Sequence, residues 1–141
     1  MTLQQILDKK GRQIFSITPD KSLQDVVNML VEHNCGSLIV CEEDRMVGII
    51  TERDILRACA ELDEPLSSIP LAVRMTRNVV TCTPACDVET IMGMMTEHRV
   101  RHMPLLDNNR LAGMISIGDI VKAQHDELCL ENHYLKNYIQ S

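Results

Sequence analysis

Aromatic side chains are nearly missing from this chain of 141 residues, which has one Phe, two Tyr and no Trp. Proteins bind single-stranded nucleic acids largely by stacking bases on aromatic rings, and they bind duplexes through basic patches. Here 20 acidic residues outnumber 14 basic ones, which gives a formal net charge of −6. The composition therefore argues against general binding of nucleic acid. Any base that is bound should lie against aliphatic side chains.

Long apolar runs are missing as well, since none approaches the roughly 20 residues that a transmembrane helix needs. Residues 1–5 lack the basic and apolar segments of a secretory signal, so we expect a cytoplasmic protein without a membrane partner. Without an export signal the cysteines do not suggest disulfides. Cys82 and Cys86 have three residues between them, but no matching Cys/His pair lies elsewhere, so a zinc site has only weak support. We expect buried free thiols and no metal site at the six cysteines, Cys35, Cys41, Cys59, Cys82, Cys86 and Cys129.

An internal repeat organises the chain. A shift of 65 residues aligns 18–57 with 83–122 without a gap. The identical pairs include Thr18/Thr83, Pro19/Pro84, Gly48/Gly113 and Asp54/Asp119. We therefore predict two copies of one module. Residues 1–64 would form the first repeat with an N-terminal helix and the start of a linker, 65–125 the second repeat, and 126–141 a helical tail.

Each copy has the pattern β-α-β-β-α. In the first copy the apolar pattern predicts strands at 14–17, 37–41 and 47–50. In the second copy it predicts strands at 79–82, 102–106 and 111–115. One helix follows the first strand of each copy, and another follows the last. One copy alone would bury little apolar surface. We therefore expect an α/β (α+β) fold whose two repeats pack with pseudo-twofold symmetry around a shared core.

The most informative motif lies where the last strand of each copy meets the closing helix. A hydroxyl residue is followed three positions later by an acid, as Thr51 and Asp54 and as Ser116 and Asp119. Taken alone, this pattern is a capping box. It is also typical of a ligand site, because a helix start attracts phosphate and an acid can accept hydrogen bonds from a ribose diol. Arg53 adds a charge that suits phosphate. Duplication of the whole motif favours a nucleotide site.

This motif, Gly-apolar-x-Thr/Ser-x-x-Asp at the end of two β-α-β-β-α units, resembles the CBS (cystathionine-β-synthase) domain. The tandem pair resembles a Bateman module, over residues 3 to 125. Segments 47–55, 99–105 and 116–122 and the Tyr138-Ile139 ending are similar to stand-alone bacterial CBS-pair proteins.

The resemblance implies a non-catalytic regulatory module in signal transduction that binds adenine nucleotide in clefts between the repeats. AMP is the first candidate, and ADP, ATP and NAD(H) are alternatives. One site would combine Thr51, Arg53 and Asp54 with Val100, Arg101, His102 and Met103. The other would combine Ser116 and Asp119 with Gly36, Ser37, Leu38 and Lys10.

Arg101 and His102 occupy positions that bind phosphate in similar modules, although they can also be read as a surface basic pair. Gly36 and Ser37 take these places in the first copy, and Gly118 replaces Arg53 in the second. We therefore expect two unequal sites.

The resemblance further implies a disc-like homodimer and a regulated protein partner. Two other functions remain as alternatives, a module for S-adenosylmethionine and a nucleotide-processing enzyme. The sequence has no P-loop, no GxGxxG and no recurring nucleophile–base set, so we expect no catalytic residues.

Overall fold

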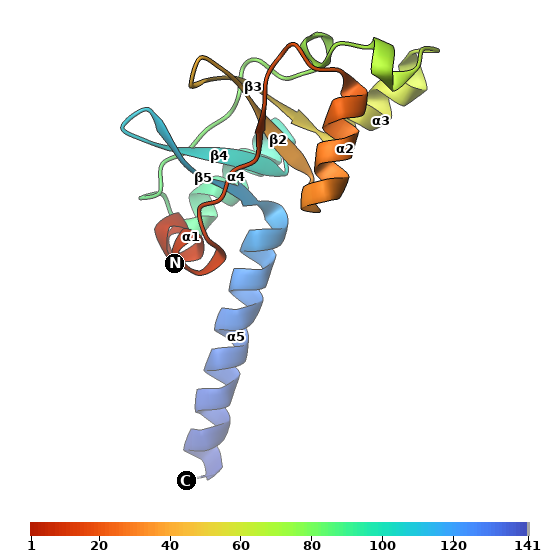
Figure 1. Cartoon of the computed structure of the whole chain (residues 1–141). Helices are drawn as coiled ribbons and strands as arrows, with labels where there is room; N and C mark the ends of the chain where they lie inside the picture. The colour runs from red at the N-terminus through yellow and green to blue at the C-terminus, as the bar shows by residue number, and fades with distance from the viewer. Residues whose placement is uncertain (141) are drawn as a thin grey trace. The chain divides into compact units, whose positions relative to one another are not determined.

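A computed structural model describes residues 1–140, in which the chain forms two α/β units (Figure 1). The repeat-1 unit comprises Ile14–Val79. The repeat-2 unit comprises residues 1–13 and the chain from residue 80 onward. Each unit contains one copy of the duplicated module.

The repeat-1 unit is a three-stranded sheet with two α-helices. The strand order is β1-β2-β3, with β1 parallel to β2 and β2 antiparallel to β3. Leu23, Leu38 and Ile50 are fully buried in its apolar core. The elements are β1 (Ser16–Ile17), α2 (Leu23–His33), β2 (Ser37–Glu42), β3 (Arg45–Thr51), α3 (Glu52–Glu61) and the 3-10 turns η1 (Leu66–Ser68) and η2 (Leu71–Val73).

Local sequence signals account for these elements. Helix α2 begins with a capping box, in which the Ser22 N–H donates to Asp25 Oδ2 (2.9 Å) and the Asp25 N–H donates to Ser22 Oγ (3.2 Å). It ends at Asn34, whose left-handed conformation is typical of a helix C-cap. Glu43 and Asp44 connect β2 to β3. Both have positive φ angles, as the central residues of a tight hairpin turn require.

The repeat-2 unit follows the same plan. Its elements are α1 (Leu3–Lys10), α4 (Val88–His98), β4 (His102–Asp107), β5 (Arg110–Ser116) and α5 (Ile117–Gln140). Helix α4 and strands β4 and β5 begin and end 65 residues after α2, β2 and β3. Arg99 has a left-handed backbone conformation, as Asn34 does at the equivalent position of the first copy. Both hairpins have a register shift at equivalent residues, at Val40/Cys41 and at Leu105/Leu106. The structure thus confirms the duplication and its α/β class.

The prediction of a strand over 79–82 was wrong. This segment forms only one parallel bridge, between Cys82 and Leu105. In the repeat-1 unit, the Ile39 N–H donates to the Phe15 carbonyl (3.1 Å), which joins β1 to β2. The residue equivalent to Ile39 is Pro104, which has no N–H and cannot make that bond. Strand pairing is therefore restricted to the surroundings of Cys82.

Two segment boundaries differ from the predicted ones. Helix α1 belongs to the repeat-2 unit, where Leu3 and Leu7 are fully buried, although the predicted segment 1–64 joined it to the first repeat. Helix α5 continues without a break through the predicted boundary at residue 126 (Figure 1). Each unit has an apolar core cluster of its own, and the predicted packing of the two repeats with pseudo-twofold symmetry stays a prediction.

Candidate ligand-binding corners

Corner 1 is the point at which β3 ends and α3 begins, at Thr51 and Asp54. The Thr51 N–H donates to Asp54 Oδ2 (2.9 Å), and the Asp54 N–H donates to Thr51 Oγ1 (3.4 Å). The Thr51 hydroxyl donates to the same carboxylate oxygen (3.1 Å). Both side chains are half-buried. The capping box that the sequence predicts is therefore present at this corner.

Corner 2 is the equivalent point between β5 and α5, at Ser116 and Asp119. The Ser116 N–H donates to Asp119 Oδ2 (2.8 Å), and the Asp119 N–H donates to Ser116 Oγ (3.2 Å). At both corners the acid caps through Oδ2 alone. Within residues 1–140, Oδ1 of Asp54 and of Asp119 accepts no hydrogen bond. Each corner thus keeps a carboxylate oxygen available to a ligand hydroxyl.

Lys10, at the end of α1, lies against corner 2. Its Nζ is 2.6 Å from Asp119 Oδ2 and 2.5 Å from the Met114 carbonyl oxygen. Burial raises the pKa of Asp119, but hydrogen bonds from Lys10 and from the Ser116 N–H, together with the Lys10 charge, outweigh burial and lower it. Asp119 is therefore ionised at neutral pH. The family resemblance names Lys10 for this site, and the structure brings the two side chains together.

Corner 1 lacks such an ion pair, since Asp54 pairs with no cation in the described part of the chain. Met75 and Thr76 pack closely over β3 at Gly48. A Cβ at Gly48 would lie 2.8 Å from the Thr76 carbonyl oxygen and 3.0 Å from Met75 Sδ. Only glycine allows this close approach. The sequence missed this covering segment, which lies outside the aligned residues 18–57.

The start of β2 adjoins corner 1 of its own unit. Ser37 pairs with Thr51 across the two strands, and the Glu52 N–H donates to the Gly36 carbonyl oxygen (3.0 Å). Because the Asp54 N–H is bonded to Thr51, two of the first three N–H groups of α3 have protein acceptors. The helix start therefore offers fewer free donors to a phosphate than the sequence pattern suggests.

The start of β4 adjoins corner 2 in the same way. His102 pairs with Ser116, and the Ile117 N–H donates to the Arg101 carbonyl oxygen (2.9 Å). Arg101 is exposed and His102 is half-buried. The structure thus brings both basic residues to the corner that also holds Lys10. Their predicted pairing with Thr51, Arg53 and Asp54 stays a prediction, as does that of Gly36, Ser37 and Leu38 with Ser116 and Asp119.

Three other predicted site residues contribute to the apolar cores. The side chains of Leu38 and Met103 are fully buried, and Val100 is half-buried against the core of the repeat-2 unit. A ligand would meet Leu38 or Met103 through the backbone alone. Arg53, in contrast, is exposed beside corner 1.

The cysteines differ in exposure. All six are free thiols in residues 1–140, but only Cys82 is buried, whereas Cys59 and Cys129 are exposed. The expectation that all would be buried was therefore wrong. No three His, Cys, Asp or Glu side chains among the described residues are placed to hold a metal ion. Likewise, none of the described helices combines the length and the apolar character needed to cross a bilayer.

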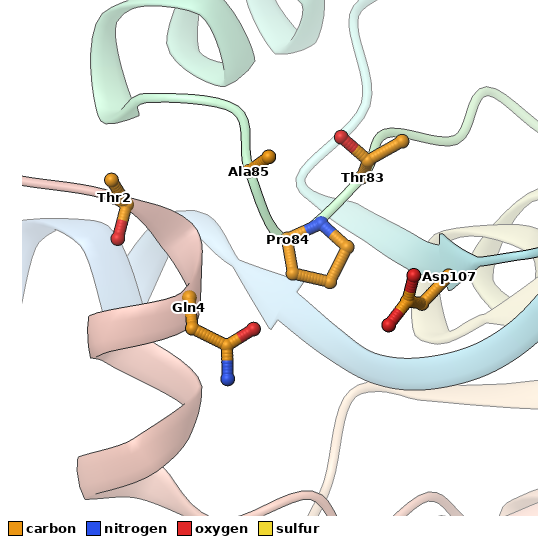
Figure 2. A pocket seen from close by; sticks show the side chains of 6 residues that line it. All are labelled: Thr2, Gln4, Thr83, Pro84, Ala85 and Asp107. Carbon is orange, nitrogen blue, oxygen red and sulfur yellow. The ribbon is translucent and has the colours of Figure 1, made fainter.

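The repeat-2 unit also has an open depression on its surface (Figure 2). Its volume is about 420 Å³, and its lining residues are Thr2, Gln4, Thr83, Pro84, Ala85 and Asp107. It contains none of the predicted site residues. We therefore centre the candidate site on the corners, where the carboxylates and basic groups lie.

Comparison with known proteins assigns this architecture to a family. Residues 10–61 and 67–126 match the CBS domain, and both stretches extend beyond a Thr/Ser–Asp corner. The chain belongs to the CBS domain family. Because the two CBS domains follow one another, the chain is a Bateman module.

Similar CBS proteins span nearly the whole chain. The mitochondrial CBS domain-containing protein CBSX3 of Arabidopsis thaliana is 34% identical, over 99% of this chain and 72% of its own length. The crystal structure of the CBS-domain protein ATU1752 of Agrobacterium tumefaciens is also similar, with 38% sequence identity and a TM-score of 0.85. The match covers 88% of this chain and 99% of the ATU1752 chain. The CBS pair of protein MJ0100, crystallised with 5′-methylthioadenosine and S-adenosyl-L-methionine, is 25% identical. Its TM-score is 0.77, with 87% of this chain and 98% of its own covered.

Proposed function

We propose that this CBS pair is a non-catalytic sensor of adenine nucleotides, with AMP as the first ligand to test and ADP, ATP and NAD(H) as alternatives. The observation that carries the proposal is the pair of half-buried acids, Asp54 and Asp119, each with Oδ1 unused by the described residues. Acids in dinucleotide-binding sites accept a hydrogen bond from a ribose hydroxyl, and the unused Oδ1 atoms offer the same kind of acceptor. The MJ0100 pair, which holds two adenosyl compounds, supports this class of ligand.

Basic side chains beside the corners would bind the phosphate groups. Corner 1 offers Arg53, which is exposed and forms no ion pair with the described residues. Corner 2 has three basic residues near it, Lys10, Arg101 and His102. Guanidinium and ammonium groups form charge-assisted hydrogen bonds with phosphate oxygens. Because the number of charges differs, we expect the two corners to bind the same nucleotide with unequal affinity.

The signal would pass to another protein or to a second copy of this chain. We expect a homodimer, because most soluble oligomers are symmetric homo-oligomers and twofold dimers are the commonest of them. A module specific for S-adenosylmethionine is the second candidate, because the MJ0100 pair holds that compound.

A thermal-shift screen tests the proposal. The ligands are AMP, ADP, ATP, NAD, NADH and S-adenosylmethionine, with GMP and ribose 5-phosphate as controls for the base and the phosphate. A ligand of the native state at 100 times its Kd stabilises it by about 2.7 kcal/mol. We expect at least one adenine nucleotide to raise Tm while both controls leave it unchanged.

The other outcomes distinguish the alternatives. A shift with S-adenosylmethionine alone would favour the second candidate. Turnover of any nucleotide would favour an enzyme. If no adenosyl compound raises Tm, the proposed function is wrong.

A further inference from the structure

We infer that Cys82 and Cys86 form a dithiol–disulfide site that reacts with small-molecule disulfides. The two cysteines enclose a three-residue loop, 83–85, ahead of α4. Cys86 packs against the apolar cluster that contains Cys82, and the Thr83 hydroxyl oxygen lies 3.6 Å from Cys86 Sγ. Neither cysteine takes part in the ligand-binding corners.

Backbone hydrogen bonds fix both ends of the loop that carries the two cysteines. The Cys86 N–H donates to the Thr83 carbonyl oxygen (3.1 Å), which turns the chain back on itself. Cys82 is fixed to β4, because its N–H donates to the Pro104 carbonyl oxygen (3.3 Å) and its own carbonyl accepts from the Leu106 N–H (2.8 Å). Both ends of the loop are thus anchored in the repeat-2 unit.

The two thiols are unequal. The hydrogen bond with Cys82 lowers the pKa of Cys86. Burial, reinforced by Cys86, raises the pKa of Cys82 to about 11. Cys86 is also the more accessible thiol, half-buried where Cys82 is buried. Since the thiolate is the nucleophile, Cys86 attacks first and Cys82 follows.

The open depression gives a small molecule room beside this loop (Figure 2). Thr83, Pro84 and Ala85, which separate the two cysteines, line it on one side. Its volume is about 420 Å³, and it is open to solvent.

The chemistry takes two steps. The Cys86 thiolate attacks one sulfur of a disulfide RSSR, which forms Cys86–S–SR and releases RS⁻. Cys82 then loses its proton and attacks the Cys86 sulfur, which forms the Cys82–Cys86 disulfide and releases the second RS⁻. The two cysteines lose two electrons, and RSSR is reduced to two thiols once these take up protons.

Oxidised glutathione tests the site in the intact protein. After incubation, free thiols are alkylated and the chain is digested with trypsin. Cleavage after Arg77 and Arg99 leaves both cysteines in peptide 78–99 with no third cysteine. A disulfide oxidant is preferable to peroxide, because this peptide contains three methionines, Met92, Met94 and Met95.

Peptide 22–45 is the internal control. It contains Cys35 and Cys41. Burial raises the pKa of both thiols, and the described structure shows no contact between them. We expect peptide 78–99 to lose two hydrogens, to escape alkylation and to recover both thiols with dithiothreitol. Peptide 22–45 should stay alkylated at both cysteines.

Two variants assign the roles. Cys82→Ser should retain glutathione on Cys86, whereas Cys86→Ser should leave Cys82 a free thiol. The inference is overturned if peptide 78–99 is alkylated as fully as peptide 22–45, or if wild-type protein retains glutathione on Cys86. The peptide readout uses the wild-type chain, so it does not depend on the folding of either variant.

Discussion

Replacing Lys10 with Met tests the ion pair at corner 2, because the variant keeps the length of the side chain and loses its charge. The two charged atoms are 2.6 Å apart, and the side chains of Lys10 and Asp119 are 32% and 23% exposed. Exposed ion pairs contribute about 0.2–1 kcal/mol, and partial burial places this one near the upper end. A loss of about 1 kcal/mol lowers Tm by roughly 3–5 °C in a protein of this size.

The pH dependence identifies the cause of this loss. Burial raises the pKa of Asp119, but the bonds from Lys10 and Ser116 outweigh it, so the folded-state pKa lies below 3.8. A lowered pKa contributes stability above the unfolded-state value, and this stability is lost as pH falls through the folded-state value. The difference between wild type and Lys10→Met should therefore be full at pH 7 and should shrink as pH falls below 3.8 through the lowered folded-state pKa.

The assay is urea denaturation followed by circular dichroism at several pH values, with Lys9→Met as the matched control. Lys9 lies in the same last turn of α1, and it forms no ion pair in the described structure. Both variants remove one charge from the C-terminal end of the helix dipole. The reasoning is refuted if Lys9→Met costs as much as Lys10→Met, or if the Lys10→Met loss is undiminished at low pH.

Three further predictions concern packing, capping and charge. Gly113→Ala should destabilise the chain by about 1–3 kcal/mol in urea titrations, since its Cβ would lie 2.6 Å from Leu7 Cδ2. Gly93→Ala, in α4 with no atom from outside the local helix backbone within 4 Å of the new Cβ, should instead stabilise it by up to about 1 kcal/mol. Ser22→Ala, which removes the cap of α2, should cost about 0.5–2 kcal/mol in the same assay, and no change would refute the capping role. Arg53→Gln should weaken nucleotide binding by up to about tenfold in calorimetry, and unchanged affinity would exclude a phosphate contact.

The sequence predicted best what depends on local signals. The positions of α2, α4 and both hairpins follow from turn residues, caps and apolar spacing, which the offset of 65 repeats. The capping boxes at Thr51 and Ser116 follow from the same short-range pattern. Because each of these features is formed within a few residues, one sequence is sufficient to find them.

What the sequence missed depends on contacts between distant segments. Helix α1 is next to the first repeat along the chain, yet Leu7 packs over Gly113 in the repeat-2 unit. Pro104 reads as an ordinary strand residue, although its missing N–H prevents the pairing that Ile39 makes. The ion pair of Lys10 and Asp119 joins residues far apart in sequence, and only the family resemblance indicated it.

Calorimetric titration of AMP into wild type, Asp54→Ala, Asp119→Ala and the double variant tests the central claim most directly. Asp25→Ala is the matched control, because Asp25 caps α2 through the same capping box away from both corners. We predict that each single variant loses the binding of its own corner, that the double variant loses all binding, and that Asp25→Ala binds as wild type does. Wild-type affinity in a folded double variant would contradict the account.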